Sequence, residues 1–367
     1  MTSRPKSAPV QGAVRGRGAK SNRSGRFEAV QREDIDDGWT LEDPEPPRLD
    51  DKLTPLKSRT IITRNDSPDI GFDQSINPYV GCSHGCIYCY ARPAHAYMGL
   101  SPGIDFESDL FFKPEAGGLL ERELRNPRYV PKVIHVGGNT DPYQPAERRL
   151  RLTRSVLEMM ARFNHPLSII TKSALITRDL DILGPMAERG LVRAAVSVTT
   201  LDRKLARAME PRAATPERRL AAISALTKAG VPTAVMFAPV IPGLNDHELE
   251  GVLERAAEAG ATSAGYVALR LPLEIKDLFA EWLEAERPER ARRVMSLVRQ
   301  MRGGRDYDPE WRTRMKGEGP IADLIRQRFK AALARYGYAE DRTSLRLDLF
   351  ERPPQAGDQI DLFAGRG

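Results

Sequence analysis

Short apolar runs alternate with helical patterns along the middle of the chain, and this alternation restricts the possible folds more than any other feature. The segments between the runs have helical patterns, and the clearest begins with Thr215 as N-cap and Pro216 at the first helical position and ends at Gly230. Strands that alternate with helices form parallel sheets, because a parallel pair needs a long crossover connection. The apolar runs of strand length occupy 133–136, 167–171, 192–198, 233–238 and 265–269.

The number of strand–helix units distinguishes the possible α/β folds. A further strand at 76–80 brings the total to about six units, fewer than the eight of a closed TIM barrel. We therefore predict an α/β fold with an incomplete (β/α)6 TIM-like barrel, followed by C-terminal helices at 288–301 and 320–336. A doubly wound open sheet is the alternative.

Both ends of the chain differ in composition from this body. Residues 1–26 are rich in Ser, Gly, Arg and Lys, and residues 43–47 read Asp-Pro-Glu-Pro-Pro. Such segments bury too little apolar surface to offset the entropy lost on ordering. We therefore expect a disordered basic arm and acidic linker over 1–51, one folded body over 52–340 and a flexible tail over 341–367.

Hydropathy and charge restrict the location and the class of partner. No apolar run reaches the roughly 18 residues that a membrane span needs, and the N-terminus lacks the short apolar stretch of a secretory signal. We expect a cytoplasmic protein with no membrane partner. The net charge is +6 and the arm is basic, which favours an acidic partner such as DNA.

All three cysteines of the chain lie close together. Cys82, Cys86 and Cys89 have the spacing Cys-x3-Cys-x2-Cys, with the aromatic Tyr88 just before the last. An odd number of neighbouring cysteines cannot form a disulfide framework, whereas thiolates are the ligands of iron–sulfur clusters. Three thiolates hold three irons of a cubane and leave the fourth iron open for a small molecule. One alternative is a structural zinc site with His84 as the fourth ligand. The other is that the three thiols have no common role.

The segment 77–90 resembles the signature of the radical S-adenosylmethionine superfamily in both spacing and aromatic. Its Asn-Pro-Tyr beginning and Tyr-Cys-Tyr end resemble the branch of spore photoproduct lyase and the photolyase-like proteins. The resemblance covers roughly residues 60–340. It implies a [4Fe–4S] cluster on the three cysteines and reductive cleavage of S-adenosylmethionine to methionine and a 5′-deoxyadenosyl radical. It also implies a one-electron reductant such as flavodoxin or ferredoxin.

Polar residues follow the predicted strands, at the end where barrels of this kind place their sites. The resemblance implies that the loop at 137–141 binds the methionine amino group, with Asn139 where the family usually has an acid. The other strand ends would face the methionine carboxylate, the ribose or the adenine. Each residue also has an ordinary alternative, such as a simple turn or a solvated lysine. The expected cofactor-binding residues are Tyr88, Gly137, Gly138, Asn139, Thr140, Asp141, Lys172, Ser197, Thr199 and Arg270.

The catalytic hydrogen-atom donor is a separate question. Spore photoproduct lyases use an additional cysteine to return a hydrogen atom to the product, but all three cysteines here are assigned to the cluster. We therefore expect a tyrosine such as Tyr143 to donate instead, unless the substrate differs.

The end of the chain carries a short peptide that resembles a docking motif. The segment 359–363 reads Gln-Ile-Asp-Leu-Phe, like the peptide by which bacterial repair proteins and polymerases bind the DNA polymerase sliding clamp. Gln359, Leu362 and Phe363 would make the contacts. The alternative is a tail that packs on the body.

Taken with the basic charge, these features predict a radical S-adenosylmethionine enzyme that acts on DNA, in lesion repair or modification. One alternative is an enzyme of the same superfamily that modifies RNA, protein or a small metabolite. The other is a non-catalytic iron–sulfur protein that binds nucleic acid.

Overall fold

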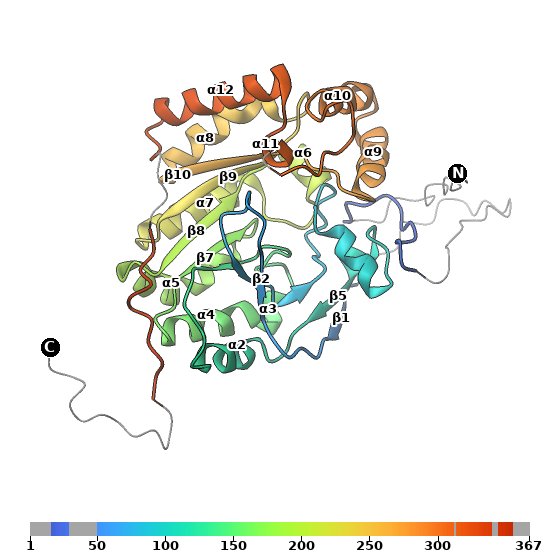
Figure 1. The fold of residues 1–367 in the computed structure, drawn as a ribbon. Helices are drawn as coiled ribbons and strands as arrows, with labels where there is room; N and C mark the ends of the chain where they lie inside the picture. Colours follow the sequence, from blue (N-terminus) through green and yellow to red (C-terminus); the bar gives the residue numbers. More distant parts are fainter. Residues whose placement is uncertain (1–15, 29–49, 312, 340–343, 355–367) are drawn as a thin grey trace.

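The computed structural model describes residues 16–28, 50–311, 313–339 and 344–354. Its main sheet has seven strands in the order β10–β9–β8–β7–β6–β3–β2 (Figure 1). Neighbouring strands are parallel throughout, except that β2 pairs antiparallel with β3. The strands are β2 (Ile62–Arg64), β3 (Gln74–Ile76), β6 (Ile134–Val136), β7 (Leu167–Thr171), β8 (Val192–Ser197), β9 (Thr233–Val240) and β10 (Ser263–Ala268).

The strand order confirms the incomplete barrel. From β3 to β10 the parallel strands follow one another in sequence order without a reversal. A doubly wound sheet reverses its order at the point where it binds ligands, so that alternative is wrong. The sheet stays open, with β10 at one edge and the antiparallel β2 at the other. All five apolar runs of the sequence form strands, because buried parallel strands need apolar side chains on both faces.

The predicted strand at 76–80 is split between two sheets. Ile76 ends β3, and β4 (Tyr79–Val80) belongs to a three-stranded sheet in the order β1–β5–β4, with β1 (Lys52–Pro55) and β5 (Asp109–Phe112). Pro78 between the two strands has no N–H to donate to a sheet. The side chain of Asn77 instead accepts the N–H of Asn139 at 2.8 Å and so connects this turn to the loop after β6.

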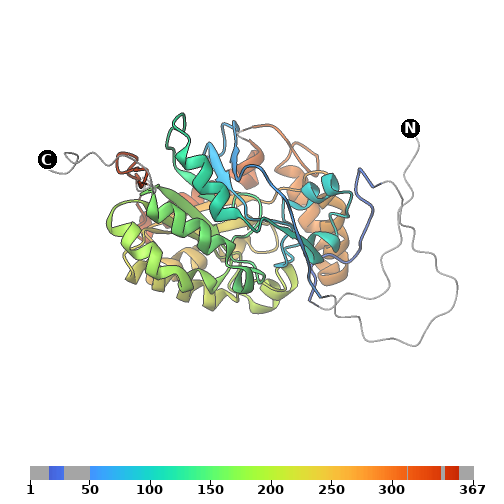
Figure 2. The same cartoon turned by 90° about the horizontal axis from the view of Figure 1, so that it is seen from below.

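Helices cover the outer face of the main sheet. Figure 2 shows the green and yellow connecting helices in one layer on one side of the strands. The α-helices are α1 (Asp105–Ser108), α2 (Ala116–Arg125), α3 (Glu147–Leu150), α4 (Leu152–Arg162), α5 (Leu180–Glu188), α6 (Arg203–Met209), α7 (Pro216–Lys228), α8 (Leu249–Glu258), α9 (Ile275–Glu286), α10 (Pro288–Gln300), α11 (Thr313–Lys316) and α12 (Gly319–Arg335). The 3-10 helices are η1 (Arg92–Met98), η2 (Ala174–Asp179) and η3 (Asp246–Glu248).

The N-terminal helix signals of the sequence are confirmed at α7. Pro216 is its first residue, and Thr215 before it has an extended backbone. The helix buries Ala222, Ile223 and Leu226, which belong to the main core with the strands they cover. Of the described residues, no helix combines the length and the apolar character needed to cross a membrane.

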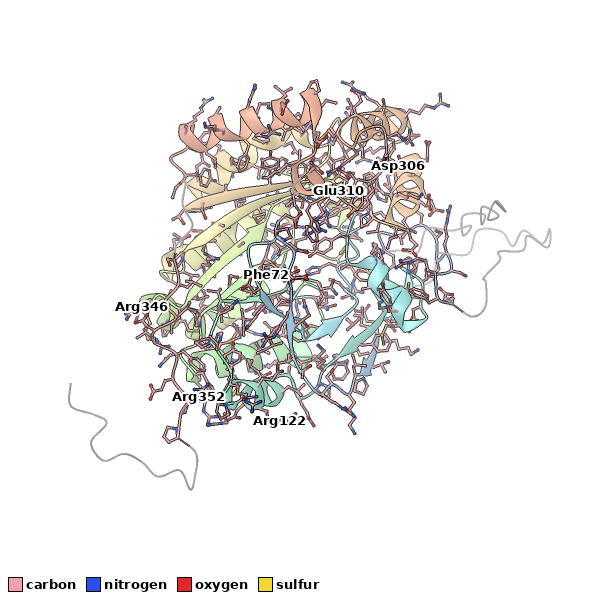
Figure 3. All side chains as sticks on the ribbon, in the orientation of Figure 1. Phe72, Arg122, Asp306, Glu310, Arg346 and Arg352 are labelled. Carbon is pink, nitrogen blue, oxygen red and sulfur yellow. The ribbon has the colours of Figure 1, made fainter. Side chains whose placement is uncertain are left out.

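Both terminal segments contain packed residues, which corrects the predicted disorder in part. Within the expected arm, residues 16–28 lie against the body, and Ala19 is only 1% exposed. Within the expected tail, Phe350 stacks on Phe163, and the segment 344–354 runs down one edge of the molecule, where Figure 3 labels Arg346 and Arg352. The residues of the proposed clamp peptide, Gln359, Leu362 and Phe363, lie outside the described residues.

Candidate functional site

A cavity of about 630 Å³ opens at the carboxyl ends of the main-sheet strands, where barrels of this kind carry their sites. The three cysteines are among the residues that line it. The structure thus brings together most of the residues that the sequence singled out. Besides the cysteines, the predicted residues in the lining are Tyr88, Gly137, Gly138, Asn139, Thr140, Asp141, Lys172, Ser197 and Arg270.

The cysteine loop follows β4 and turns on two glycines. Gly81 and Gly85 have φ of +79° and +69°, a region that residues with a side chain rarely adopt. A Cβ on Gly85 would lie 2.7 Å from the Oε2 of Glu107. The loop can therefore wrap closely only because these two positions lack side chains.

Gln144 fixes the loop from the side of β6. It is fully buried. Its Oε1 accepts the N–H of Ser83 at 3.1 Å, and its Nε2 donates to the carbonyl of Gly81 at 3.1 Å. These bonds hold the backbone on both sides of Cys82. This role has no signal in the sequence, because a single glutamine in a turn matches no motif.

Arg92 and Glu107 fix the loop from the opposite side. Both are 0% exposed and form an ion pair. The guanidinium of Arg92 also donates to the carbonyls of Cys86 at 2.9 Å and Gly85 at 3.2 Å. A buried pair of this kind is maintained only when its remaining donors and acceptors have partners. Here the cysteine loop supplies those partners.

The cysteine side chains lie in surroundings that disfavour a free thiolate. Burial raises the pKa of both Cys86 and Cys89, since a free thiolate loses its solvation there. Within the part of the chain that the structure describes, no three His, Cys, Asp or Glu side chains are grouped closely enough to hold a single metal ion.

His84 and Asp141 form a buried pair beside the loop. The Nδ1 of His84 lies 3.4 Å from the Oδ2 of Asp141. Burial alone would lower the pKa of His84, but the charges of Asp141 and Cys82 raise it to about 10. Burial would raise the pKa of Asp141, but His84 and the donors around it lower it to about 2. The pair is therefore charged at neutral pH.

Asp141 also holds the end of β7. Its Oδ1 accepts the hydroxyl of Thr171 at 2.6 Å, and its Oδ2 accepts the N–H of Lys172 at 2.7 Å. The carboxylate thus has structural partners on both oxygens, although the residue lines the cavity.

Lys172 carries a positive charge into the cavity. Burial would lower its pKa, but the neighbouring Cys86 and the carboxylate of Glu210 raise it. Its Nζ lies 5.8 Å from the centre of the Tyr88 ring, within the range of a cation–π contact.

Tyr88 is fixed from behind by a buried ion pair that has no signal in the sequence. Its hydroxyl donates to Glu210, which pairs with Arg219, and both are at most 2% exposed. Thr199 donates to Glu210 at 2.6 Å and is fully buried. Thr199 is therefore absent from the cavity lining and supports the site from behind, which differs from its predicted contact with the cofactor.

Aromatic side chains also line the cavity. Phe72 stacks on His135 with ring centres 4.3 Å apart, and Figure 3 shows Phe72 near the centre of the view. The guanidinium of Arg270 lies 5.4 Å from the centre of the Tyr90 ring. Two flat pairs thus face the same space. Of these four residues, only Arg270 was identified from the sequence.

Tyr143 does not reach this space. Its side chain is fully buried, and its hydroxyl donates to the Oδ2 of Asp179 at 3.1 Å. It is absent from the cavity lining, whereas Tyr88 and Tyr90 are present. The expected hydrogen-atom donor therefore does not face the cavity.

Comparisons with known proteins agree with this geometry. The model of the family described as the radical SAM superfamily matches residues 76–256. An uncharacterized protein of Mycobacterium tuberculosis is 36% identical over 272 residues, which cover 74% of this chain and 76% of that protein. An uncharacterized protein of Methanocaldococcus jannaschii is 26% identical over 200 residues, which cover 54% of this chain and 73% of that protein.

Solved structures show the same fold. Spore photoproduct lyase complexed with dinucleoside spore photoproduct superposes with a TM-score of 0.55 at 14% identity, over 77% of this chain and 79% of that one. A point mutant of spore photoproduct lyase gives a TM-score of 0.54 at 16% identity, over 77% and 79%. At such identities the likeness concerns the fold alone.

Proposed function

Since the chain belongs to the radical S-adenosylmethionine superfamily, we propose that Cys82, Cys86 and Cys89 hold a [4Fe–4S] cluster and that S-adenosylmethionine binds beside it. The observation that carries this proposal is the cavity, because three thiols of one loop line it together with the polar strand ends. When bound, such a cluster supplies the electron that cleaves S-adenosylmethionine to methionine and a 5′-deoxyadenosyl radical.

The donor set fits this group better than it fits zinc. A structural zinc site gathers four ligands around one ion, and the described residues include no such grouping. A cubane cluster instead takes one thiolate on each of several irons, which a loop with three separated thiols can provide. Gly81 and Gly85 supply the positive φ angles with which the loop turns, and a Cβ at either position would meet the residues packed behind the loop.

The residues of this chain would orient the cofactor. Lys172 keeps its charge and would face the methionine carboxylate. The backbone at Gly137 and Gly138 would accept the amino group. The hydroxyl of Tyr90 donates to the carbonyl of Gly138, so an amino group that takes this carbonyl would displace Tyr90. The hydrogen bond to Glu210 fixes the ring of Tyr88 beside Lys172.

We propose DNA as the substrate, in lesion repair or modification. The pair of Phe72 and His135 and the pair of Tyr90 and Arg270 offer flat surfaces to a base, as in proteins that stack unpaired bases on aromatic rings. Arg64 also lines the cavity, and the chain has a net charge of +6, which favours a polyanion. The fold is that of spore photoproduct lyase, a structure of which contains a dinucleoside photoproduct.

Tyr90 is the better candidate for the hydrogen-atom donor. Its ring lines the cavity, and no cysteine remains beyond the three of the loop. In this proposal a substrate radical takes the hydrogen atom from the phenolic O–H of Tyr90, and the tyrosyl radical that remains is reduced by one electron and one proton from the external reductant.

Release of 5′-deoxyadenosine tests the proposed function. The anaerobically reconstituted chain, with dithionite as reductant, should form 5′-deoxyadenosine from S-adenosylmethionine. Irradiated DNA should increase the rate over intact DNA and over no DNA. Equal rates with all three would contradict a DNA lesion as substrate, and stimulation by RNA or a peptide would favour the alternative substrates. No product from a chain with a full cluster would leave only the non-catalytic iron–sulfur protein.

Replacing Lys172 should weaken cofactor binding. A charge-assisted contact contributes about 1.5–3 kcal/mol, so Lys172→Ala should raise the Kd of S-adenosylmethionine by roughly one to two orders of magnitude. Equilibrium dialysis on the reconstituted protein measures this. Lys132→Ala is the matched control, because Lys132 lies at the surface and pairs with Asp73. An unchanged Kd in Lys172→Ala would place the carboxylate elsewhere.

The C-terminal peptide adds a second partner to test. Docking of Gln359, Leu362 and Phe363 on a sliding clamp remains a prediction of the sequence.

A further inference from the structure

A segment near the N-terminus lies against the cysteine loop. Residues 16–28, which we call the strap, run beside the cyan segment that contains η1 and beside the orange α9 in both views (Figures 1 and 2). Arg17 is 5% exposed, Ala19 1% and Ser21 1%. A segment with so few apolar residues becomes buried only if specific polar partners receive it.

The first contact is between two backbones. A Cβ on Gly18 would lie 1.9 Å from the carbonyl oxygen of Gly85. Gly85 stands between Cys82 and Cys86, so the strap touches the loop that carries the thiols. No residue other than glycine fits at position 18 unless the backbone of the strap or of the cysteine loop moves.

The second contact consists of hydrogen bonds from the strap to a buried carboxylate. The carboxylate of Glu107, 0% exposed, accepts the N–H of Gly18 and the N–H of Ala19, each at 2.8 Å. The same carboxylate pairs with Arg92, which donates to the carbonyls of Gly85 and Cys86. The strap and the cysteine loop thus share one buried carboxylate, and Glu107 loses two donors if the strap leaves.

Ion pairs hold the rest of the strap along α9. These pairs are partly exposed, so each contributes little by itself. Arg17 adds a link through Asp51, which also pairs with Arg212, and the N–H of Arg212 donates to the carbonyl of His84 in the cysteine loop at 3.3 Å. The pairs along α9 are Lys20 with Glu286, Arg23 with Glu281 and Arg26 with Glu274.

We propose that the strap is a cover for the cysteine loop, which shields the cluster from water and dioxygen and thereby sets its lifetime and its reduction potential. This inference rests on the proposed cluster. The potential of an iron–sulfur cluster depends on its hydrogen bonds and on its exposure to solvent. Reduction adds negative charge, and a dry environment disfavours the more highly charged state. Removal of the strap should therefore shift the potential in the positive direction and let dioxygen destroy the cluster faster.

Three variants test the cover. One is the chain from residue 29 onward, the second is Gly18→Ala, and the matched control is Lys20→Ala, which removes only a partly exposed ion pair. After anaerobic reconstitution, a redox titration followed by electron paramagnetic resonance gives the midpoint potential. The decay of the cluster absorbance in air gives its lifetime. The truncated chain and Gly18→Ala should lose the cluster several-fold faster and have a more positive potential, while Lys20→Ala should match the wild type.

Addition of the strap as a separate peptide provides the rescue. A synthetic peptide of residues 16–28 should restore the lifetime and the potential of the truncated chain, and the same peptide with Gly18→Ala should not. If the truncated chain does not fold, the comparison of Gly18→Ala with Lys20→Ala still decides. Unchanged lifetime and potential in Gly18→Ala would overturn the inference.

A readout without the cluster separates this inference from the proposed function. In the iron-free chain, iodoacetamide should alkylate the cysteines faster in Gly18→Ala than in the wild type or Lys20→Ala. A wild-type chain that binds no iron would overturn the proposed cluster, whereas equal alkylation rates in all three would overturn the cover.

Discussion

Replacement of any one of Cys82, Cys86 and Cys89 by Ala is expected to abolish the cluster and with it all cleavage of S-adenosylmethionine. Each thiol would bind a different iron, so no other ligand in the loop can replace it. The reconstituted wild type should contain about four irons per chain, as the cubane type requires, and each variant should lose the brown absorbance.

Ser83→Ala is the matched control for these variants. Ser83 lies in the same loop and is 0% exposed, and its hydroxyl has no hydrogen-bond partner among the described residues. This variant should therefore keep its iron and its activity. Cysteine variants with the iron content of the wild type, or a colourless wild type with one zinc per chain, would refute the proposed cluster.

Glu210→Gln is expected to cause the largest loss of stability. The carboxylate is fully buried, and its partner Arg219 is 1% exposed. Burial would raise the pKa of Glu210, but Arg219 lowers it, so the pair is charged. Loss of one partner leaves the other charge buried and unpaired, which costs about 3–5 kcal/mol in the free energy of unfolding. Urea denaturation followed by circular dichroism measures this change.

Two companion variants separate the charge from the packing. Glu210→Gln combined with Arg219→Met removes both charges and should recover most of the lost stability, because neither member of the ion pair is left charged without the other. Glu217→Gln breaks the exposed pair with Arg203 and should cost less than about 1 kcal/mol. If Glu210→Gln lowered the free energy of unfolding no more than Glu217→Gln does, the buried pair of Glu210 and Arg219 would not stabilise the fold.

The main sheet could be predicted from the sequence because its signal is local. Buried parallel strands appear as short apolar runs, and β7 coincides with the predicted 167–171. The cysteine motif is equally local, since its spacing alone places three thiols on one loop. The split between β3 and β4 was missed, because an apolar run does not show that Pro78 ends one sheet and begins another.

The supporting residues of the site could not be predicted, because they act over long separations in the sequence. Glu107 meets Gly18 and Gln144 meets Gly81 only in the folded chain. The strap was expected to be disordered because its composition is polar, but backbone N–H groups that reach a buried carboxylate leave no trace in composition. Tyr143 was named because no fourth cysteine is present, but the residue type does not show where a ring points, and the structure places this ring in the core.

The segment 344–354 and the strap lie near different parts of the body, and this difference decides where a label can be attached. The segment 344–354 runs past the residues that precede the strands: the N–H of Arg346 donates to the carbonyl of Gly190, and that of Glu351 to Phe163. The last described residues therefore lie at the end of the sheet away from the cavity. A label attached within 344–354 would therefore leave the cavity open, whereas a label attached to the strap would lie next to the cysteine loop.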